Sequence, residues 1–184
     1  MLLTKLNYYE NESQPDEWQI EDLTLGSQNL IVGRNATGKT RLYRVISNFS
    51  KIITESMPYL NGRFDLTFTD SDVSYNYSIK ITNGKVEYEY YRRDETLLIS
   101  RDNTAMQIIH ILNGEEQLRE ISPPENKLVI HVRRDNKEFP YIEMLHEWAG
   151  NIVSIRFIEQ QSNSVRATAE NASTVLDKDG TIYY

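Results

Sequence analysis

The residue types that could do chemistry are concentrated in one stretch, which runs from Gly33 to Thr40 and reads GRNATGKT. It satisfies the spacing G-x-x-x-x-G-K-[ST] in full. Gly33 and Gly38 permit backbone conformations and close approach that a Cβ atom would obstruct. Successive backbone N–H groups can then point inward and surround an anion. Lys39 is predicted to contact the β- and γ-phosphates, and the Thr40 hydroxyl to ligate Mg²⁺, so the spacing predicts ATP with Mg²⁺ as the ligand.

The remaining loop positions complete the predicted binding site. Asn35, Ala36 and Thr37 supply backbone amides to the same cradle. Arg34 and Arg41 flank it and could help to neutralise phosphate charge, although a side chain at position 34 could equally face solvent. The catalytic role predicted for Lys39 is to stabilise, with the loop amides, the charge on a transferring phosphoryl group.

A loop of this kind needs a buried strand before it and a helix after it. Asn29–Val32 is short and apolar and runs directly into the loop, so a buried strand is predicted there. Lys39–Met57 has apolar residues three and four positions apart, which predicts an amphipathic helix whose positive N-terminal end faces the phosphates. Leu2–Tyr9 and Trp18–Leu25 predict two further strands.

Between Arg63 and Asp135 the apolar residues recur with a period of two, which is typical of an antiparallel meander. Val86, Tyr88 and Tyr90 are predicted to share one face of a strand that follows the hairpin turn Asn83-Gly84. Further strands are predicted at 64–68, 73–81, 96–100, 106–112, 117–121 and 128–132. A helix at 141–148 and a returning strand at 152–158 follow. The predicted organisation is one domain: residues 1–60 with the loop and first helix, a β insertion at 63–135, a helix and strand at 139–160, and a polar tail at 161–184.

Composition excludes several function classes. The chain has 184 residues and a formal net charge of -7, which argues against a nucleic-acid binder held mainly by diffuse positive charge. It contains no cysteine, so disulfides and thiolate metal sites are excluded. The sequence shows no signal-peptide pattern and no apolar run near the ~18 residues that span a bilayer. We therefore expect a soluble, cytoplasmic protein with no membrane partner.

The loop letters carry a resemblance to a known family. Asn35-Ala36-Thr37 within the loop resembles the G-x-N-G-[SA]-G-K-[ST] form used by ABC-type ATPases, with Ala36 in place of the usual middle glycine. That group includes the SMC/Rad50 and RecF heads and the AAA-like ATPases of overcoming-lysogenization-defect and phage-defense proteins. The resemblance covers about residues 1–160. It implies an α/β fold: a P-loop NTPase core, like the N-terminal lobe of an ABC-type ATPase head, with a large antiparallel β-meander subdomain.

Other parts of that family's site have no counterpart in the sequence. A signature segment, a Walker B strand ending in Asp-Glu and a switch histidine are not visible, and Leu128–Val132 runs into Arg133-Arg134-Asp135 instead. The resemblance therefore implies an N-terminal lobe that is truncated, or completed by a second subunit, with a homodimer as the hydrolytic form. ATP hydrolysis coupled to conformational change is the first hypothesis. A non-catalytic nucleotide-binding module that mediates protein–protein interaction is the alternative, and a small-molecule kinase is a third.

Two weaker candidates for the nucleotide site follow from the same resemblance. Gln160 or Gln161 could be the glutamine that touches Mg²⁺ and the attacking water, or could belong to a polar loop. Tyr8 or Tyr9 could stack on adenine, although packing in the core is the favoured interpretation of both.

Three further sets of residues have an ordinary structural explanation. Asp70-Ser71-Asp72 resembles a metal-binding D-x-D, but is favoured as a turn. The three histidines lack metal-ligand spacing and are predicted to be structural. The pairs Arg92-Arg93 and Arg133-Arg134 could contact DNA, with a solvated sheet edge as the alternative. The histidines are His110, His131 and His146.

Overall fold

The computed structural model describes two compact units, one at Met1–Ala149 and the other at Gly150–Tyr184. The described residues are 1–34, 37–102, 106–153, 155–161 and 164–169. Among them, no helix combines the length and apolar character that crossing a membrane requires.

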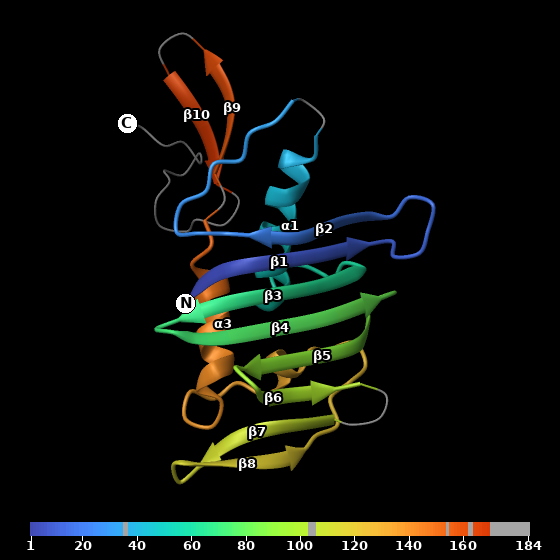
Figure 1. The fold of residues 1–184 in the computed structure, drawn as a ribbon, viewed down its shortest axis with the longest axis vertical. Helices are drawn as coiled ribbons and strands as arrows, with labels where there is room; N and C mark the ends of the chain where they lie inside the picture. Colours follow the sequence, from blue (N-terminus) through green and yellow to red (C-terminus); the bar gives the residue numbers. More distant parts are fainter. Residues whose placement is uncertain (35–36, 103–105, 154, 162–163, 170–184) are drawn as a thin grey trace. The chain divides into compact units, whose positions relative to one another are not determined.

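The first unit is built on one eight-stranded sheet in the order β2-β1-β3-β4-β5-β6-β7-β8 (Figure 1). Every pair of neighbouring strands in it is antiparallel. Tight hairpins explain this arrangement, because Asn83-Gly84 and Asn113-Gly114 place residues with positive φ at the reversals. The strands are β1 (Leu2–Glu10), β2 (Trp18–Thr24), β3 (Gly62–Asp70), β4 (Val73–Thr82), β5 (Lys85–Arg93), β6 (Thr96–Arg101), β7 (Met106–Leu112) and β8 (Glu115–Glu120).

The predicted α/β fold with a P-loop NTPase core is wrong, because the described sheet is antiparallel throughout. β1 and β2 form a hairpin in which Glu10 lies opposite Trp18, and β1 also pairs directly with β3, with Leu6 opposite Leu66. The N-terminal strands therefore extend the meander, whereas the prediction separated them from it. A parallel core would need strands joined through crossover connections and paired side by side. The antiparallel strands predicted between residues 63 and 121 do occur.

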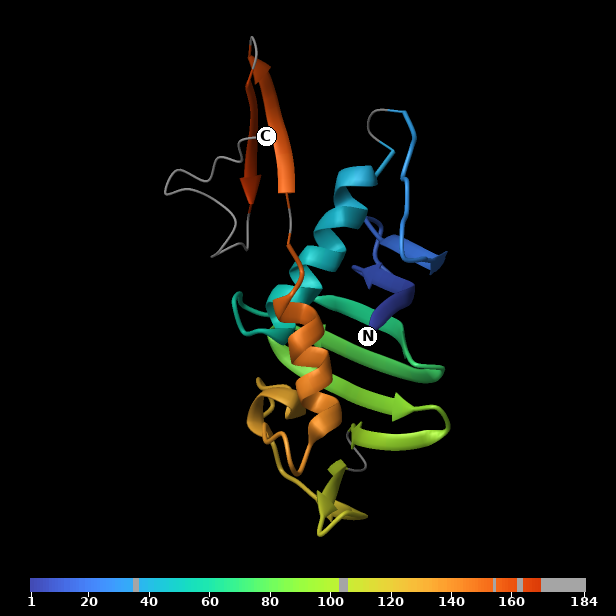
Figure 2. The ribbon, with the colours of Figure 1, turned by 90° about the vertical axis from the view of Figure 1, so that its left-hand side faces the viewer.

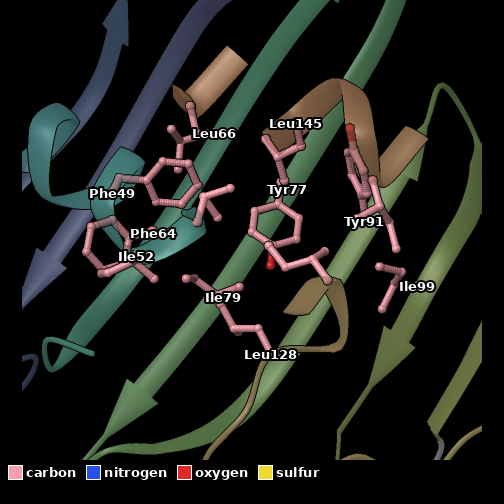
Figure 3. Close-up of a cluster of buried hydrophobic side chains, with 14 of the residues drawn as sticks. Phe49, Ile52, Phe64, Leu66, Tyr77, Ile79, Tyr91, Ile99, Leu128 and Leu145 are labelled. Atoms are coloured by element: carbon pink, nitrogen blue, oxygen red, sulfur yellow. The ribbon is translucent and has the colours of Figure 1, made fainter. Parts of the chain in front are cut away.

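Helices cover one face of the sheet (Figure 2). They are α1 (Lys39–Ile53), the four-residue α2 (Val129–Val132) and α3 (Pro140–Gly150). Phe49 of α1 packs against Phe64 with ring centroids 5.6 Å apart, and Trp148 of α3 packs against Phe68 at 4.7 Å. Figure 3 shows Phe49 and Leu145 meeting the inward side chains of β3 to β5. The hydrophobic core thus anchors α1, and with it the start of the helix at Lys39.

A β-bulge changes which side chains of β5 face this core. The register shifts between Lys80 and Ile81, so that Lys80 pairs with Tyr88 but Ile81 pairs with Val86. Since one extra residue reverses the direction of every later side chain, the buried residues of β5 after Val86 are Glu89 and Tyr91. The predicted alternation of Val86, Tyr88 and Tyr90 is therefore wrong. Tyr88 and Tyr90 share the other face, where their rings stack with centroids 5.3 Å apart.

The predicted strand at 128–132 is also wrong, because these residues form the short helix α2. Two side chains bind the amides at its start: the buried Glu89 carboxylate accepts from Val129 N at 2.6 Å, and the partly buried Tyr59 hydroxyl accepts from Leu128 N at 2.9 Å. Arg101 donates to the carbonyl oxygens of Pro124 and Lys127 just before it. These long-range contacts satisfy the backbone without a neighbouring strand.

The second unit contains a two-stranded antiparallel hairpin. β9 (Ile155–Gln161) pairs with β10 (Ser164–Ala169), with Gln161 opposite Ser164. The returning strand predicted at 152–158 corresponds to β9, which begins and ends three residues later. Part of the predicted polar tail forms β10, and residues 170–184 lie outside the described residues.

Candidate phosphate-binding site

The segment that leads into the phosphate loop (residues 33–40) is exposed and irregular. Asn29 turns the chain, since its side chain accepts from Gly26 N at 2.9 Å and donates to Gly26 O at 2.8 Å. Leu30 is 88% exposed and Val32 78% exposed. The buried strand predicted at Asn29–Val32 is therefore wrong. A strand needs a hydrogen-bonded neighbour, and within the described part of the chain the backbone of residues 30–32 makes no hydrogen bond to another backbone group.

The phosphate loop leads into α1. The backbone conformation of Gly38, and not a capping side chain, defines where this helix starts. Gly38 has φ 90° and ψ 2°, and its carbonyl accepts the first intrahelical bond, from Leu42 N at 2.9 Å. All residues of α1 are described. No side chain caps the helix, and its first turn carries no acidic residue. The first amides of a helix have no intrahelical partner and lie at the positive end of its dipole. This end of α1 is therefore chemically suited to an anion.

Lys39 folds back over the first two residues of the phosphate loop. Its Nζ donates to the carbonyl oxygens of Gly33 at 2.7 Å and Arg34 at 2.6 Å. The Thr37 hydroxyl donates to the same Arg34 oxygen at 2.9 Å. A Cβ atom added at Gly33 would lie 2.8 Å from Thr37 Oγ1, so any other residue there would force the Thr37 side chain to shift. The structure thus brings together the two ends of the loop around one ammonium group.

The other predicted loop residues divide into described and undescribed positions. Thr40 is exposed in the first turn of α1, and Arg34 is exposed before it. Asn35 and Ala36 lie outside the described residues. The phosphate contacts predicted for these residues remain predictions.

Arg41 is held beside the loop by two groups that sequence reasoning did not connect to it. Its guanidinium lies 4.1 Å from the centre of the Trp18 ring, and its Nη2 donates to Glu10 Oε2 at 2.8 Å. Trp18 also lies close to the loop itself, 3.8 Å from the position that a Cβ atom at Gly38 would take. The signal that could have found Trp18 is the hairpin register, which sets it opposite Glu10.

The two tyrosines considered for base stacking are engaged in other contacts. Tyr8 is 5% exposed and packs on Phe64 at 4.7 Å, which confirms the favoured interpretation as a core residue. Burial raises the pKa of its hydroxyl above the ordinary value. Tyr9 lies under the Arg63 guanidinium, 3.7 Å from ring centre to Cζ, and donates to Glu21 Oε1 at 3.2 Å.

Gln160 and Gln161 belong to β9 in the second unit, where Gln160 pairs with Val165 through the backbone. A role of either glutamine at the phosphate loop remains a prediction.

Of the remaining candidates, the acidic turn takes the structural role that was favoured for it, whereas the basic pairs do not lie at a sheet edge, since β5 is flanked by β4 and β6 and Arg133-Arg134 follows α2. Asp70-Ser71-Asp72 turns the chain between β3 and β4, with positive φ at Ser71 and Asp72. Arg93 pairs with Glu116 at 2.8 Å, and Arg134 with Glu143 at 2.7 Å. DNA contact by these pairs remains a prediction. Within the described residues, no group of three or more acidic or histidine side chains could hold a metal ion.

A buried polar cluster next to α2 escaped the sequence analysis. Glu89 is fully buried, accepts from the Tyr77 hydroxyl at 2.8 Å, and has its pKa raised to about 7 by burial. His131 lies in α2 and not in a strand as predicted. Its Nδ1 lies 2.7 Å from the Tyr59 hydroxyl and its Nε2 3.0 Å from Ile53 O. Since a carbonyl only accepts, Nε2 carries the proton and Nδ1 accepts from Tyr59. Burial lowers the pKa of His131 to about 4.

No signal in the strand pattern marks Glu89 as buried, because the bulge reverses the alternation before it.

Neither a scan against protein-family models nor searches of curated proteins and of solved structures finds a match to this chain.

Proposed function

We propose that the chain binds a nucleoside triphosphate, ATP with Mg²⁺, with its phosphates at the N-terminal end of α1. The observation that supports this most strongly is the uncapped first turn of α1, which follows Gly38 and has no acidic side chain. Lys39 adds one positive charge within that loop. Backbone amides at a helix start together with a lysine provide both hydrogen bonds and charge for a polyphosphate.

Lys39 would exchange partners when phosphate binds. Its present partners are the neutral carbonyl oxygens of Gly33 and Arg34. A phosphate oxygen carries negative charge, so its bond to the ammonium group gains a Coulomb attraction between opposite charges that a neutral carbonyl oxygen does not provide. The exchange therefore favours the ligand.

The donor set also agrees with a magnesium ion that arrives with the nucleotide. Mg²⁺ keeps several waters and is usually bound through phosphates and one or two protein oxygens. Thr40 offers one exposed hydroxyl in the first turn of α1, and no ready-made acidic cage exists among the described residues. A resident metal without nucleotide is therefore not part of the proposal.

Hydrolysis belongs to the proposal only together with a further lobe or a second subunit that supplies a catalytic carboxylate. Glu10, the carboxylate that contacts Arg41 beside the loop, is engaged in that ion pair. The exposed Leu30 and Val32 next to the loop favour a partner surface here. The alternative is a non-catalytic module whose nucleotide stabilises contact with a partner. Single-turnover conversion of radiolabelled ATP, with and without the candidate partner, separates the two.

The binding claim is tested by titration calorimetry with ATP and MgCl₂. The variant is Lys39→Ala, and the matched control is Lys137→Ala, which removes an exposed lysine in the turn before α3. Loss of the charge-assisted contact should weaken binding by about ten- to a hundredfold in Lys39→Ala, and the control should bind like the parent. Equal affinities for the parent and Lys39→Ala would overturn the proposed site.

A further inference from the structure

A pocket of about 330 Å³ lies along α1 beside the phosphate loop. One side is formed by Arg41, Arg44 and Asn48, which occupy one face of α1 at spacings of three and four. The opposite side is formed by Glu10 at the end of β1 and by Asn61 just before β3. This pocket, called the α1 pocket below, has the size at which small-molecule sites begin.

The lining of the α1 pocket combines an apolar floor with a few polar groups. Tyr8, Val45 and Phe64 lie beneath it and are almost fully buried, so the partly exposed Leu60 supplies the apolar surface that a ligand can contact. Asn48 and Asn61 add carboxamides, each with both donor and acceptor capacity. Asn61 Oδ1 already accepts from the backbone of Asn83 at 2.7 Å, which leaves its NH₂ group for a ligand. A planar heterocycle with hydrogen-bonding edges matches this chemistry, since it needs a surface to stack on and paired donors and acceptors.

The pocket also lies within reach of the phosphate site. Arg41 follows Gly38 by three residues and Asn48 follows it by ten, so the pocket runs from roughly 5 to 15 Å along the helix from the loop. The Arg41 guanidinium lies at the end nearer the loop, fixed between the Trp18 ring and the Glu10 carboxylate. A cation in that position would lie between the phosphates of one ligand and its sugar.

We propose that the α1 pocket receives the nucleoside part of the triphosphate, with the base against Leu60 and its polar edge against Asn48. The inference rests on the proposed function, because it takes the phosphates to lie at the start of α1. It adds that the chain contacts the base and the sugar as well as the phosphates. Inorganic tripolyphosphate, which has the phosphates alone, should therefore bind more weakly than ATP.

The test compares ATP and tripolyphosphate, each with MgCl₂, by calorimetry on the parent, Asn48→Leu and Arg44→Ala. Asn136→Leu, in an exposed turn, is the matched control, and thermal unfolding verifies that each variant is folded. The parent should bind ATP at least about tenfold more tightly than tripolyphosphate. Asn48→Leu should weaken ATP binding by about tenfold and leave tripolyphosphate binding within about twofold of the parent, because it removes only the polar edge contact.

The outcomes separate this inference from the function on which it rests. If the parent binds both ligands equally, or if Asn48→Leu and Arg44→Ala leave the preference for ATP intact, the α1 pocket is not the nucleoside site. If Lys39→Ala still weakens the binding of both ligands in that case, the proposed phosphate site is supported and the proposed nucleoside site is not. If the parent binds neither ligand, both proposals fail. A loss of both ligands in folded Asn48→Leu also contradicts the assignment, since it would show no selectivity for the nucleoside.

Discussion

The ammonium group of Lys39 lies 2.7 Å from the carbonyl oxygen of Gly33, so a lysine near the end of the phosphate loop contacts the loop's first residue. A second bond, to Arg34 at 2.6 Å, fixes the same group. The described residues Gly33 and Arg34 are therefore held to Lys39 by contacts that an anion can replace. Glycine matters at positions 33 and 38 for different reasons.

Replacing Gly38 by alanine should destabilise the start of α1. A side chain at φ 90° is strained, and the penalty for the left-handed region is roughly 1–2 kcal/mol. Urea unfolding of Gly38→Ala should show that loss, and ATP affinity should fall with it. Gly150→Ala is the matched control, because nothing lies within 4 Å of the added methyl group and its φ is not positive. Equal stability of the two variants would contradict the described loop conformation.

The exposed approach to the loop gives a second prediction. Leu30→Ala should change the free energy of unfolding by less than about 0.5 kcal/mol, because the side chain is 88% exposed. Leu66→Ala, the same substitution at a fully buried position of β3, should cost roughly 2–5 kcal/mol. Urea unfolding of both variants measures the difference. A cost for Leu30→Ala near that of Leu66→Ala would show that the segment is buried as a strand after all.

This segment also shows why part of the fold was predictable and part was not. Hairpin turns such as Asn83-Gly84 and the helix at Lys39 depend on neighbouring residues, so the sequence predicts them. Whether Leu30 is buried depends on a strand elsewhere that could pair with it. An apolar triplet carries no information about such a partner. The prediction of an α/β P-loop NTPase core failed for the same reason.

Substituting Glu89 by glutamine should make stability respond differently to pH. The pKa of Glu89 is raised from 4.5 to about 7 in the folded protein, so ionising it there is unfavourable. Its contribution to stability is complete below pH 4.5 and is lost as the pH rises to about 7. Glu89→Gln cannot ionise. Relative to the parent, its free energy of unfolding should rise between pH 4.5 and 7, by an amount on the order of 3 kcal/mol.

Thermal unfolding of the parent and Glu89→Gln across pH 4 to 8 measures this difference. Glu87→Gln, an exposed change two residues away on β5, is the control and should follow the parent. A constant offset between Glu89→Gln and the parent at every pH would contradict the raised pKa.

His131 should act in the opposite direction. Its pKa is lowered from 6.5 to about 4, chiefly by burial, and burial also lowers the pKa of His146. As the pH falls, these imidazoles therefore become protonated in the unfolded chain at a higher pH than in the folded protein. The stability that the two neutral histidines contribute above pH 6.5 is lost as the pH falls towards 4. Imidazole NMR signals of the folded protein should show His131 neutral at pH 6. A His131 midpoint near 6.5 would refute the buried arrangement with Tyr59.

The candidate site was predictable to a similar extent as the fold. Gly33, Gly38 and Lys39 were found from spacing alone, because one short segment contains the whole pattern. Trp18 was missed because its proximity to Gly38 arises from hairpin pairing and not from sequence distance. Glu89 was missed because a single bulge reverses the strand alternation before it. Long-range pairing and local register, which a linear pattern does not encode, account for both omissions.

The central claim is that main-chain amides at the start of α1 bind the phosphates of ATP. Backbone ¹⁵N–¹H spectra recorded during titration with ATP and MgCl₂ test it most directly. The largest shifts should fall on the amides of Gly38, Lys39 and Thr40, and should be reproduced by tripolyphosphate because the phosphates cause them. Saturating ATP that leaves these three amides unmoved, or that shifts only residues away from the loop, would contradict the account.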